Sequence, residues 1–412
     1  MKILYLVHQF YPEFYTGTEK FVYNIALMTQ KFGNKVKVIT YSFYEDTYYD
    51  KSIGNILVKE FIYKGIPVLA FKFKNEPYDL NFGLKNPGLY DFAENIIKDE
   101  NPDIIHVGHP MRVSEFIKVA LKLNIPYIIT LTDFFLMCPK GILITSNGNL
   151  CIGPERGIIC DKMCSELSKI YVESRLKEAE HILMNAKKVL SPSKFVASMF
   201  KKEFSNLKVD IVNHGIRYKN IKANNKTYGY RENIIFCYAG SLNYHKGVHI
   251  LLQAFKSIEN KDIKLRIYGS GPKEYVNKLK DIVKNDDRVE FCGVFSEEQV
   301  GSILSSVDVI VVPSTWYENY PLILHEALAC NIPVIASNLG GMAEKIKEGF
   351  NGFTFDTGDY KSLKEKMEFI IDNPQVLNEI KKNIKREVVI PRIEQEAYNY
   401  LKIYENLYNV KK

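Results

Sequence analysis

Residues 3–41 read ILYLVHQFYPEFYTGTEKFVYNIALMTQKFGNKVKVITY. The opening apolar run, ILYLV, is typical of a short buried strand. A polar loop with Gly17 near its end follows, and then apolar residues at helical spacing in FVYNIALMTQKFG, where a glycine marks the helix end. KVKVITY predicts a second strand. This order of strand, loop, helix and strand is a βαβ unit, so we expect a parallel sheet covered by helices.

The same alternation continues to residue 216 and starts again after the segment YKNIKANNKTYGYREN (218–233). That segment contains few apolar residues and is typical of a linker. A chain of 412 residues also exceeds what one hydrophobic core usually serves. We therefore predict an α/β protein with two doubly wound, Rossmann-like domains that face a cleft, residues 1–216 and 217–385. A C-terminal helix within 386–412 should pack back on the first domain.

The composition is that of an ordinary soluble globular protein, with 46% hydrophobic and 25% charged residues. The net charge of +7 is mildly basic, but Lys and Arg are scattered, so nucleic acid is not an expected partner. No window approaches the ~20 apolar residues of a membrane-spanning helix, and the N-terminus lacks the pattern of a secretory signal. We expect a cytoplasmic protein whose contact with an anionic membrane, at its inner face, would be peripheral.

Two loops that follow strands of the second half carry features suited to an anionic ligand. YAGSLNYHKG (238–247) places Gly240 and Lys246 before a helix, where free amides and a cation favour a phosphate. YGSGP (268–272) is a tight turn after a strand. Neither loop matches the Walker A or GxGxxG pattern. A strand–turn–helix with a solvated lysine therefore stays an alternative for the first loop, and a purely structural turn for the second.

A third loop leads into the stretch ENYPLILHEALAC (318–330). This stretch contains two carboxylates, Glu318 in the loop and Glu326 inside the following helix. At ~1.5 Å rise per residue the two carboxylates lie roughly 8–12 Å apart. A retaining glycosidase pair needs ~5 Å, and an inverting pair ~6.5–9.5 Å. The spacing favours two contacts along one extended ligand, such as sugar, diphosphate and ribose in a row, over one acid–base pair. Taken singly, each glutamate is also compatible with a plain surface position.

These motifs resemble glycosyltransferase family 4, retaining enzymes of the GT-B fold with an EX7E signature, over nearly the whole chain. Gly240-Ser241-Leu242 with Lys246 looks like the family's G-R-L…K-G loop, and ENYPLILHEALACNIPVIAS is similar to its E…P…EA run. The resemblance implies that Glu318 binds donor-sugar hydroxyls, that Glu326 binds the ribose hydroxyls, and that Lys246 neutralises the diphosphate. The donor-binding residues that it implies are Gly17, Thr18, Gly240, Ser241, Lys246, Gly269, Cys292, Glu318, Asn319, Tyr320, Leu322 and Glu326.

One departure from the family pattern concerns the diphosphate. Ser241 stands where the family usually has Arg, so one of two expected cations is missing. His245 and Arg266 are the candidate substitutes.

A second departure concerns the catalytic histidine. Thr132 stands where a His is common in the family. We therefore place the catalytic histidine at His109, just beyond a strand end, with His8 as a weaker candidate. His106 lies within a strand and is expected to be packed.

Four cysteines gather in residues 134–170, which we interpret as an insertion in the first domain. They are Cys138, Cys151, Cys160 and Cys164. Four thiolates can bind zinc tetrahedrally, although no standard zinc-finger spacing is met, and an iron–sulfur cluster uses the same ligands. Four reduced thiols or two disulfides are the alternatives to a structural metal. Cys237, Cys292 and Cys330 lie in apolar strands or a helix and are expected in the core.

Together these features predict a retaining glycosyltransferase. It would move a sugar from a nucleotide-diphosphate sugar to a glycan or lipid-linked acceptor, in the synthesis of cell-surface polysaccharide, such as lipopolysaccharide or capsule, or of a glycoconjugate. The resemblance implies that catalysis needs no cofactor, which leaves a structural zinc as the one metal expected. A non-catalytic nucleotide-sugar-binding subunit and a GT-B-like epimerase or phosphorylase are the alternatives.

Overall fold

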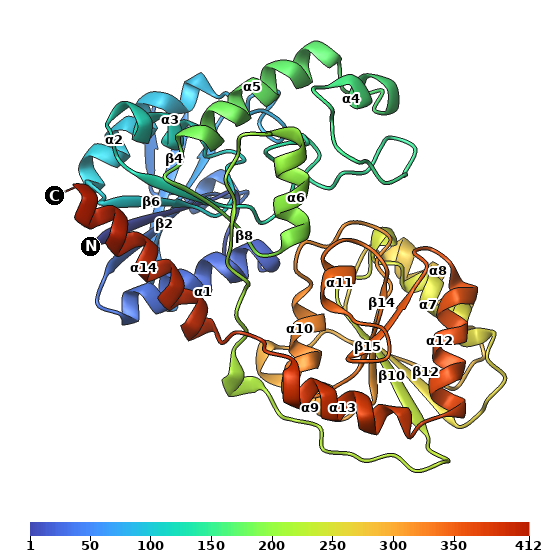
Figure 1. The fold of residues 1–412 in the computed structure, drawn as a ribbon. Coiled ribbons are helices and arrows are strands. Elements are labelled where there is room, and N and C mark those ends of the chain that lie inside the picture. Colours follow the sequence, from blue (N-terminus) through green and yellow to red (C-terminus); the bar gives the residue numbers. More distant parts are fainter. Residues whose placement is uncertain (412) are drawn as a thin grey trace. The chain divides into compact units, whose positions relative to one another are not determined.

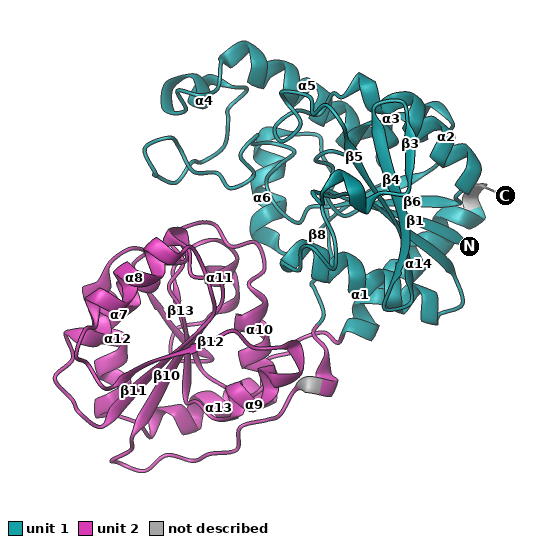
Figure 2. Cartoon of the chain, turned by 180° about the vertical axis from the view of Figure 1, so that it is seen from behind, with its two compact units in different colours: residues 1–215, 393–412 teal, residues 216–392 magenta. Residues whose placement is uncertain are grey.

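The computed structural model describes residues 1–411, without the side chains of residues 220, 410 and 411, and divides into two compact units (Figures 1 and 2). The first unit contains residues 1–215 and the C-terminal helix that begins at Ile393. The second unit contains residues 216–392. Its end lies beyond the predicted residue 385, because the helix over 376–387 packs on the second unit.

In the described part of the first unit, nine strands form one sheet, and every neighbouring pair is parallel except those that β4 makes with β3 and β5. Along the sheet the strands are β3 (Lys51–Ile53), β4 (Ile56–Tyr63), β5 (Ile66–Phe73), β2 (Lys35–Tyr41), β1 (Lys2–Val7), β6 (Ile104–Val107), β7 (Tyr127–Thr130), β8 (Lys188–Ser191) and β9 (Asp210–Ile211). The side chains of β6 and β7 are all buried, as expected for central strands covered on both faces.

The helices of the first unit are α1 (Gly17–Lys31), α2 (Tyr90–Glu100), α3 (Ser114–Lys122), α4 (Ile158–Met163), α5 (Lys169–Asn185), α6 (Lys194–Glu203) and α14 (Ile393–Lys411). Ser193 caps α6, because its side chain accepts a hydrogen bond from the amide of Val196. Figure 1 shows α14, in red, beside α1. The predicted return of the C-terminal helix to the first domain is thereby confirmed.

A buried polar network fastens α14 to the sheet. Tyr404 Oη lies 2.7 Å from Nδ1 of His106, and Tyr400 Oη lies 2.9 Å from Oγ1 of Thr130. The other nitrogen of His106 lies 2.8 Å from the same Thr130 oxygen. His106 is fully buried, so its predicted role as a packed residue is confirmed.

The described residues of the second unit form a six-stranded parallel sheet. Along it lie β12 (Val289–Gly293), β11 (Ile263–Tyr268), β10 (Ile234–Ala239), β13 (Val309–Val312), β14 (Val334–Ser337) and β15 (Gly352–Phe355). Numbered from one to six in chain order, these strands run 3-2-1-4-5-6, the order of a Rossmann-like domain. The predicted α/β class with doubly wound sheets is confirmed, whereas the cleft between the domains stays a prediction.

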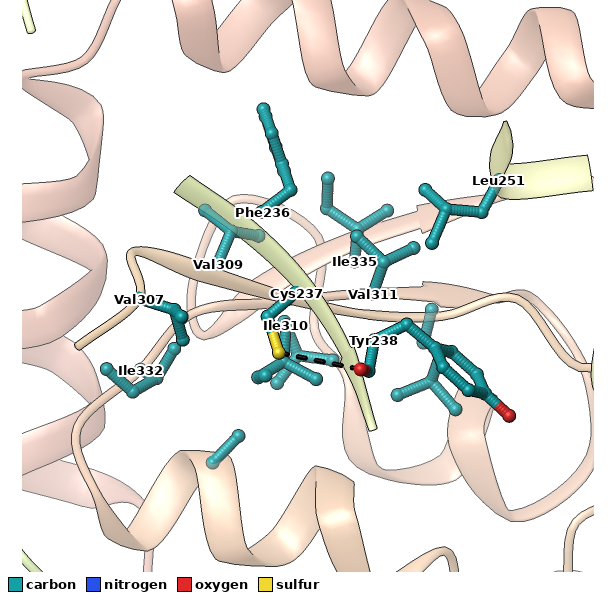
Figure 3. Close-up of a cluster of buried hydrophobic side chains, with 14 of the residues drawn as sticks. Phe236, Cys237, Tyr238, Leu251, Val307, Val309, Ile310, Val311, Ile332 and Ile335 are labelled. Carbon is teal, nitrogen blue, oxygen red and sulfur yellow. Dashed lines mark hydrogen bonds between the residues drawn. The ribbon is translucent and has the colours of Figure 1, made fainter. Parts of the chain in front are cut away.

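Helices cover both faces of this sheet: α7 (Val248–Lys256), α8 (Lys273–Ile282), α9 (Val300–Ser305), α10 (Leu322–Ala329), α11 (Gly340–Lys345), α12 (Tyr360–Asp372) and α13 (Val376–Glu387). The core between the layers is aliphatic and aromatic (Figure 3). In that view the Cys237 thiol donates to the carbonyl of Tyr238 at 3.6 Å. Cys237 and Cys330 are fully buried as predicted, but Cys292 is half-buried, because it lies on the edge strand β12.

The polar segment 218–233 is not the free linker that its composition suggests. Asn224 is buried and donates to the carbonyls of Ser305 and Val307. Tyr228 is buried as well, and its hydroxyl donates to Asp308 at 2.8 Å. The prediction was wrong because two polar side chains with specific partners, rather than an apolar run, attach this segment to the second unit.

Among the described residues, no helix combines the length and apolar character needed to cross a lipid bilayer.

Candidate active site

The strand order of the second unit reverses between β10 and β13, and the loops that follow these two strands contain several of the predicted donor residues. Lys246 follows β10, and Glu318 follows β13. Their side chains meet, with Lys246 Nζ 2.7 Å from Glu318 Oε1. Crevices at such a reversal are where open parallel sheets bind ligands, so the geometry brings these two residues to the expected edge.

One oxygen of Glu318 accepts three hydrogen bonds. Besides Lys246, Ser314 Oγ donates to Oε1 at 2.7 Å and Trp316 Nε1 donates at 2.8 Å. Burial acts to raise the pKa of Glu318, but Lys246 and the two neutral donors outweigh it and hold the pKa below its usual value. The carboxylate is therefore fixed in position and ionised.

Close backbone contacts explain the glycines of these loops. A Cβ on Gly247, whose φ is +69°, would lie 1.8 Å from the carbonyl oxygen of Pro313. A Cβ on Gly269, whose φ is +142°, would lie 1.8 Å from the carbonyl oxygen of Gly240. Gly341 donates its amide to the carbonyl of Glu318 at 2.8 Å, and a Cβ there would lie 2.4 Å from the carbonyl oxygen of Asn319. Only glycine lets these loops approach each other so closely.

Glu326 lies inside α10, as predicted, and is half-buried. Asn319 and Tyr320 precede that helix, and the ring of Tyr320 stacks on His325 at 3.5 Å between centroids. Leu322 is the first residue of the helix. The distance that the sequence predicts between the two carboxylates stays a prediction.

The two candidate substitutes for the missing family arginine have different surroundings. Arg266 is bonded to Ser306 and paired with Glu290, at 3.1 and 3.5 Å. His245 belongs to the loop that follows β10, and its ring lies 4.3 Å from that of Trp316. Ser241 itself is exposed. Of the two, His245 is the one beside the carboxylate site.

In the first unit the strand order reverses between β1 and β6, and two histidines follow those strands. The rings of His8 and His109 lie 3.9 Å apart. His109 Nε2 lies 2.7 Å from Oδ2 of Asp133, which follows the neighbouring strand β7. Its Nδ1 accepts the amide of Met111 at 3.2 Å. Both ring nitrogens of the predicted catalytic histidine are thus bonded within the chain.

Gly17 and Thr18 open α1, at the carboxyl edge of the same sheet. Gly17 is exposed and Thr18 half-buried. Glu19 next to them is fully buried and accepts hydrogen bonds from the amide and hydroxyl of Thr16, both at 2.6 Å. This capping arrangement fixes the start of the helix.

Comparisons with known proteins give the family. The model of the glycosyl transferases group 1 matches residues 197–387, and that of Glycosyltransferase Family 4 matches residues 15–219, so the two together span 15–387. The chain belongs to the GT-B glycosyltransferases. It is therefore an enzyme that transfers a sugar.

Relatives of this glycosyltransferase support the assignment. An uncharacterised glycosyltransferase of Methanocaldococcus jannaschii is 26% identical over 373 residues, which cover 90% of this chain and 89% of that protein. The N-acetyl-alpha-D-glucosaminyl L-malate synthase of Bacillus anthracis is 27% identical over 299 residues, which cover 70% of this chain and 68% of that one.

Among solved structures, Anabaena HepE in complex with UDP superposes on the glycosyltransferase with a TM-score of 0.71 and 16% identity. The match covers 98% of this chain and all of that one. WaaG, a glycosyltransferase involved in lipopolysaccharide biosynthesis, has a TM-score of 0.68 and 14% identity, with coverage of 98% and 99%. At such identities these likenesses show the fold.

The four cysteines of the glycosyltransferase's insertion are all buried, with 3–7% of each side chain exposed, and none forms a disulfide. Burial raises the pKa of Cys160 to about 12, and the charges of Cys138, Cys164 and Cys151 add to the effect. In the described part of the chain, however, no group of three or more His, Cys, Asp or Glu residues is arranged to hold a metal ion. The structural zinc stays a prediction.

Three residues of these sites were not among the predicted ones: Ser314, Trp316 and Asp133. Trp316 is the chain's single tryptophan and stands two positions before Glu318, which is a signal that the sequence offered. Asp133 directly follows Thr132, the position of the noted departure. Ser314 carries no comparable signal, because serine is frequent in loops after strands.

Proposed function

We propose that the protein is a retaining glycosyltransferase whose donor is a nucleotide-diphosphate sugar. The observation that carries this proposal is the Glu318 carboxylate at the strand-order reversal of the second unit, paired with Lys246 at 2.7 Å. A cation and an anion fixed side by side suit a ligand with a diphosphate next to sugar hydroxyls.

Each charged residue has a distinct task in this proposal. Lys246 donates to the diphosphate and stabilises the negative charge that grows on it as the sugar–phosphate bond breaks. Glu318 accepts hydrogen bonds from hydroxyls of the transferred sugar, and Glu326 does so from the ribose. With Lys246 as the counter-charge, we propose that transfer needs no divalent ion, so activity should survive an excess of EDTA.

The acceptor that we propose is a glycan or a lipid-linked sugar, used in building cell-surface polysaccharide at the inner face of the membrane. Relatives in such pathways support this choice. The lipopolysaccharide 1,2-N-acetylglucosaminetransferase of Salmonella typhimurium is 29% identical over 187 residues, which cover 41% of this chain and 49% of that protein. HepE was solved with UDP-glucose, which makes UDP-sugars the first donors to test.

A thermal-shift screen of UDP-, GDP-, ADP- and TDP-sugars tests the donor. A donor at 100 times its dissociation constant adds ~2.7 kcal/mol of stability, or roughly 5–11 °C in Tm for a unit of this size. A shift with one base and not with the others identifies the nucleotide. If no nucleotide sugar raises Tm at millimolar concentration, the proposal fails.

Proton NMR of the product then tests the stereochemistry. A retaining transferase gives a product with the anomeric configuration of its donor, whereas an inverting one gives the opposite configuration. A non-catalytic binding subunit would give no product, and an epimerase would return an altered nucleotide sugar. A phosphorylase that uses pyridoxal phosphate would show the absorbance of that cofactor.

A further inference from the structure

Three side chains stand in a row at the carboxyl edge of the first unit's sheet. The strands β1, β6 and β7 are parallel neighbours, and they are followed by His8, His109 and Asp133 respectively. The three side chains are in contact, since His8 lies against His109 and His109 is hydrogen-bonded to Asp133. Ligands bind at this edge of such sheets, and the row begins at the strand-order reversal.

The bonding of His109 fixes the position of its proton. The amide of Met111 can only donate, so Nδ1 of His109 is the acceptor and carries no proton. Nε2 then carries the proton of the neutral ring and donates it to Oδ2 of Asp133 at 2.7 Å. His109 therefore has no ring nitrogen left to bind a substrate.

Packing holds that ring in one orientation. His109 is 1% exposed, and its ring lies 3.9 Å from that of His8 and 5.2 Å from that of Phe135. Burial, with the nearby charge of Arg112, lowers the pKa of His8 well below its usual value, so the neighbouring ring is neutral as well. A buried neutral imidazole aimed at a carboxylate is suited to orienting that carboxylate.

Asp133 is the outward member of the row, with its side chain 34% exposed, against 14% for His8. Its Oδ1 accepts the amide of Phe135 at 2.8 Å, and its Oδ2 accepts His109. A carboxylate has about four lone-pair sites, so about two remain for a donor outside the chain. A hydroxyl group is such a donor.

We propose that Asp133 binds the acceptor, by accepting a hydrogen bond from a hydroxyl of a sugar ring or similar polyol, and that His109 is the positioning residue behind it. This inference rests on the proposed function and names the acceptor-binding group. It also assigns His109 a different task from that of the catalytic histidine predicted from the sequence.

Nitrogen-15 NMR of the histidine side chains tests the positioning step without an acceptor. We expect the signals of His109, assigned by their loss in His109→Phe, to show an unprotonated Nδ1 and a protonated Nε2. Asp133→Asn keeps only one of the two accepting oxygens, so its NH2 group must face one of the two donors, the amide of Phe135 or Nε2 of His109, and the His109 signals should shift. A protonated Nδ1 in the wild type, or unchanged signals in the variant, would overturn the arrangement.

Transfer kinetics test the acceptor contact. The probes are UDP-glucose and UDP-N-acetylglucosamine as donors and octyl glucoside and octyl N-acetylglucosaminide as acceptors. Asp133→Asn should lower kcat/KM for the acceptor at least tenfold and leave the Kd of UDP, read from Trp316 fluorescence, within twofold. His109→Phe keeps a ring in the same place and should lose acceptor kcat/KM to a similar degree.

Asp103→Asn is the matched control, because Asp103 also accepts a backbone amide, from Lys2 at 2.7 Å, but at the amino edge of the same sheet. It should transfer as the wild type does. If Asp133→Asn transfers within twofold of the wild type, the inference is overturned and the proposed function stands. If the wild type neither binds UDP nor transfers to these acceptors, the proposed donor and acceptor fail, and the inference fails with them.

Discussion

At the residue scale, one carboxylate oxygen of Glu318 is the point where the hydrogen bonds of the candidate site in the second unit meet. Three donors converge on Oε1, and one of them is a cation. The ring of Trp316 also lies under Lys246, with 4.7 Å from Nζ to the ring centroid. Any ligand that draws Lys246 or Glu318 toward itself must disturb this indole, which makes Trp316 a built-in reporter of donor binding.

Glu318→Gln should weaken donor binding, because it keeps the shape of the side chain but removes the charge that fixes Lys246. We expect the Kd for UDP-glucose, followed by Trp316 fluorescence, to rise at least tenfold, which is about 1.4 kcal/mol. Glu290→Gln is the control, since that carboxylate, on β12, is exposed and pairs with Arg266 on β11. An unchanged Kd in Glu318→Gln would contradict the role of the carboxylate.

The pH dependence of Glu318 follows from its lowered pKa. Because the folded-state pKa lies below the usual 4.5, ionised Glu318 stabilises the fold at pH values above 4.5, and this stabilisation is lost as the pH falls through the folded-state pKa. The Tm difference between wild type and Glu318→Gln should stay constant from neutral pH to about pH 5 and shrink below it. A difference that already shrinks between pH 7 and pH 5 would show that the pKa is not lowered.

Gly247→Ala should destabilise the second unit, because the new Cβ would meet the Pro313 carbonyl. Gly349→Ala is matched in backbone conformation, with φ of +68°, but no described atom lies within 4 Å of its Cβ position. The control should lose only the ~1–2 kcal/mol of unfolding free energy that an alanine costs in the left-handed backbone conformation. Gly247→Ala should lose clearly more. Equal losses in urea unfolding would mean that the close approach of the two loops is absent.

At the scale of elements, most of the fold was predictable because its signals are local. Apolar runs such as IIFCYAG and VDVIVVPS became the central strands β10 and β13, and PLILHEALAC became α10. The sequence signals of helices α5 and α13 are weaker, although Val172, Leu176 and Ala179 of α5 are buried at helical spacing. Their charged residues mask that spacing, since only a narrow apolar stripe faces the core.

Residues of the candidate site could be predicted where the type of side chain alone indicates a role. They could not be predicted where the role depends on which groups the fold places next to the side chain. Lys246 and Glu318 could be chosen from charge and from their place after strands. That both nitrogens of His109 are occupied could not, because the partner of Nε2, Asp133, follows a different strand, although the partner of Nδ1 is the amide of the nearby Met111. Long-range pairing of this kind leaves no trace in local spacing.

The attachment of α14 gives a stability prediction. Tyr404→Phe removes the hydroxyl partner of the buried His106 Nδ1, so we expect a loss of about 1–3 kcal/mol in the free energy of unfolding. Tyr398→Phe, on the same helix but 46% exposed, should change it by less than about 0.5 kcal/mol. Denaturant unfolding that gives equal values for both variants would contradict a packed α14.

The cysteine insertion gives a chemical prediction. Because its four thiols are reduced and 3–7% exposed, we expect none of them to react with a thiol reagent such as DTNB until the protein unfolds. Metal analysis of the same sample shows whether the four cysteines bind zinc. One equivalent per chain, lost in Cys160→Ser, would confirm the sequence-based prediction, and a metal-free protein with slow thiols would contradict it.

At the scale of the whole molecule, each unit has its own core and its own strand-order reversal. Charged and polar groups sit at both reversals, with Lys246 and Glu318 in the second unit and the His8–His109–Asp133 row in the first. We thus propose that the second unit binds the donor and the first unit binds the acceptor. The central claim is that a nucleotide diphosphate binds at the reversal of the second unit.

A crystal structure of the protein with UDP-glucose, or with the nucleotide sugar that the thermal screen selects, tests that claim most directly. The account predicts the diphosphate within hydrogen-bond distance of Lys246 Nζ, the sugar hydroxyls at Glu318 and the ribose at Glu326. A nucleotide bound on the first unit, or at the amino edge of either sheet, would contradict it.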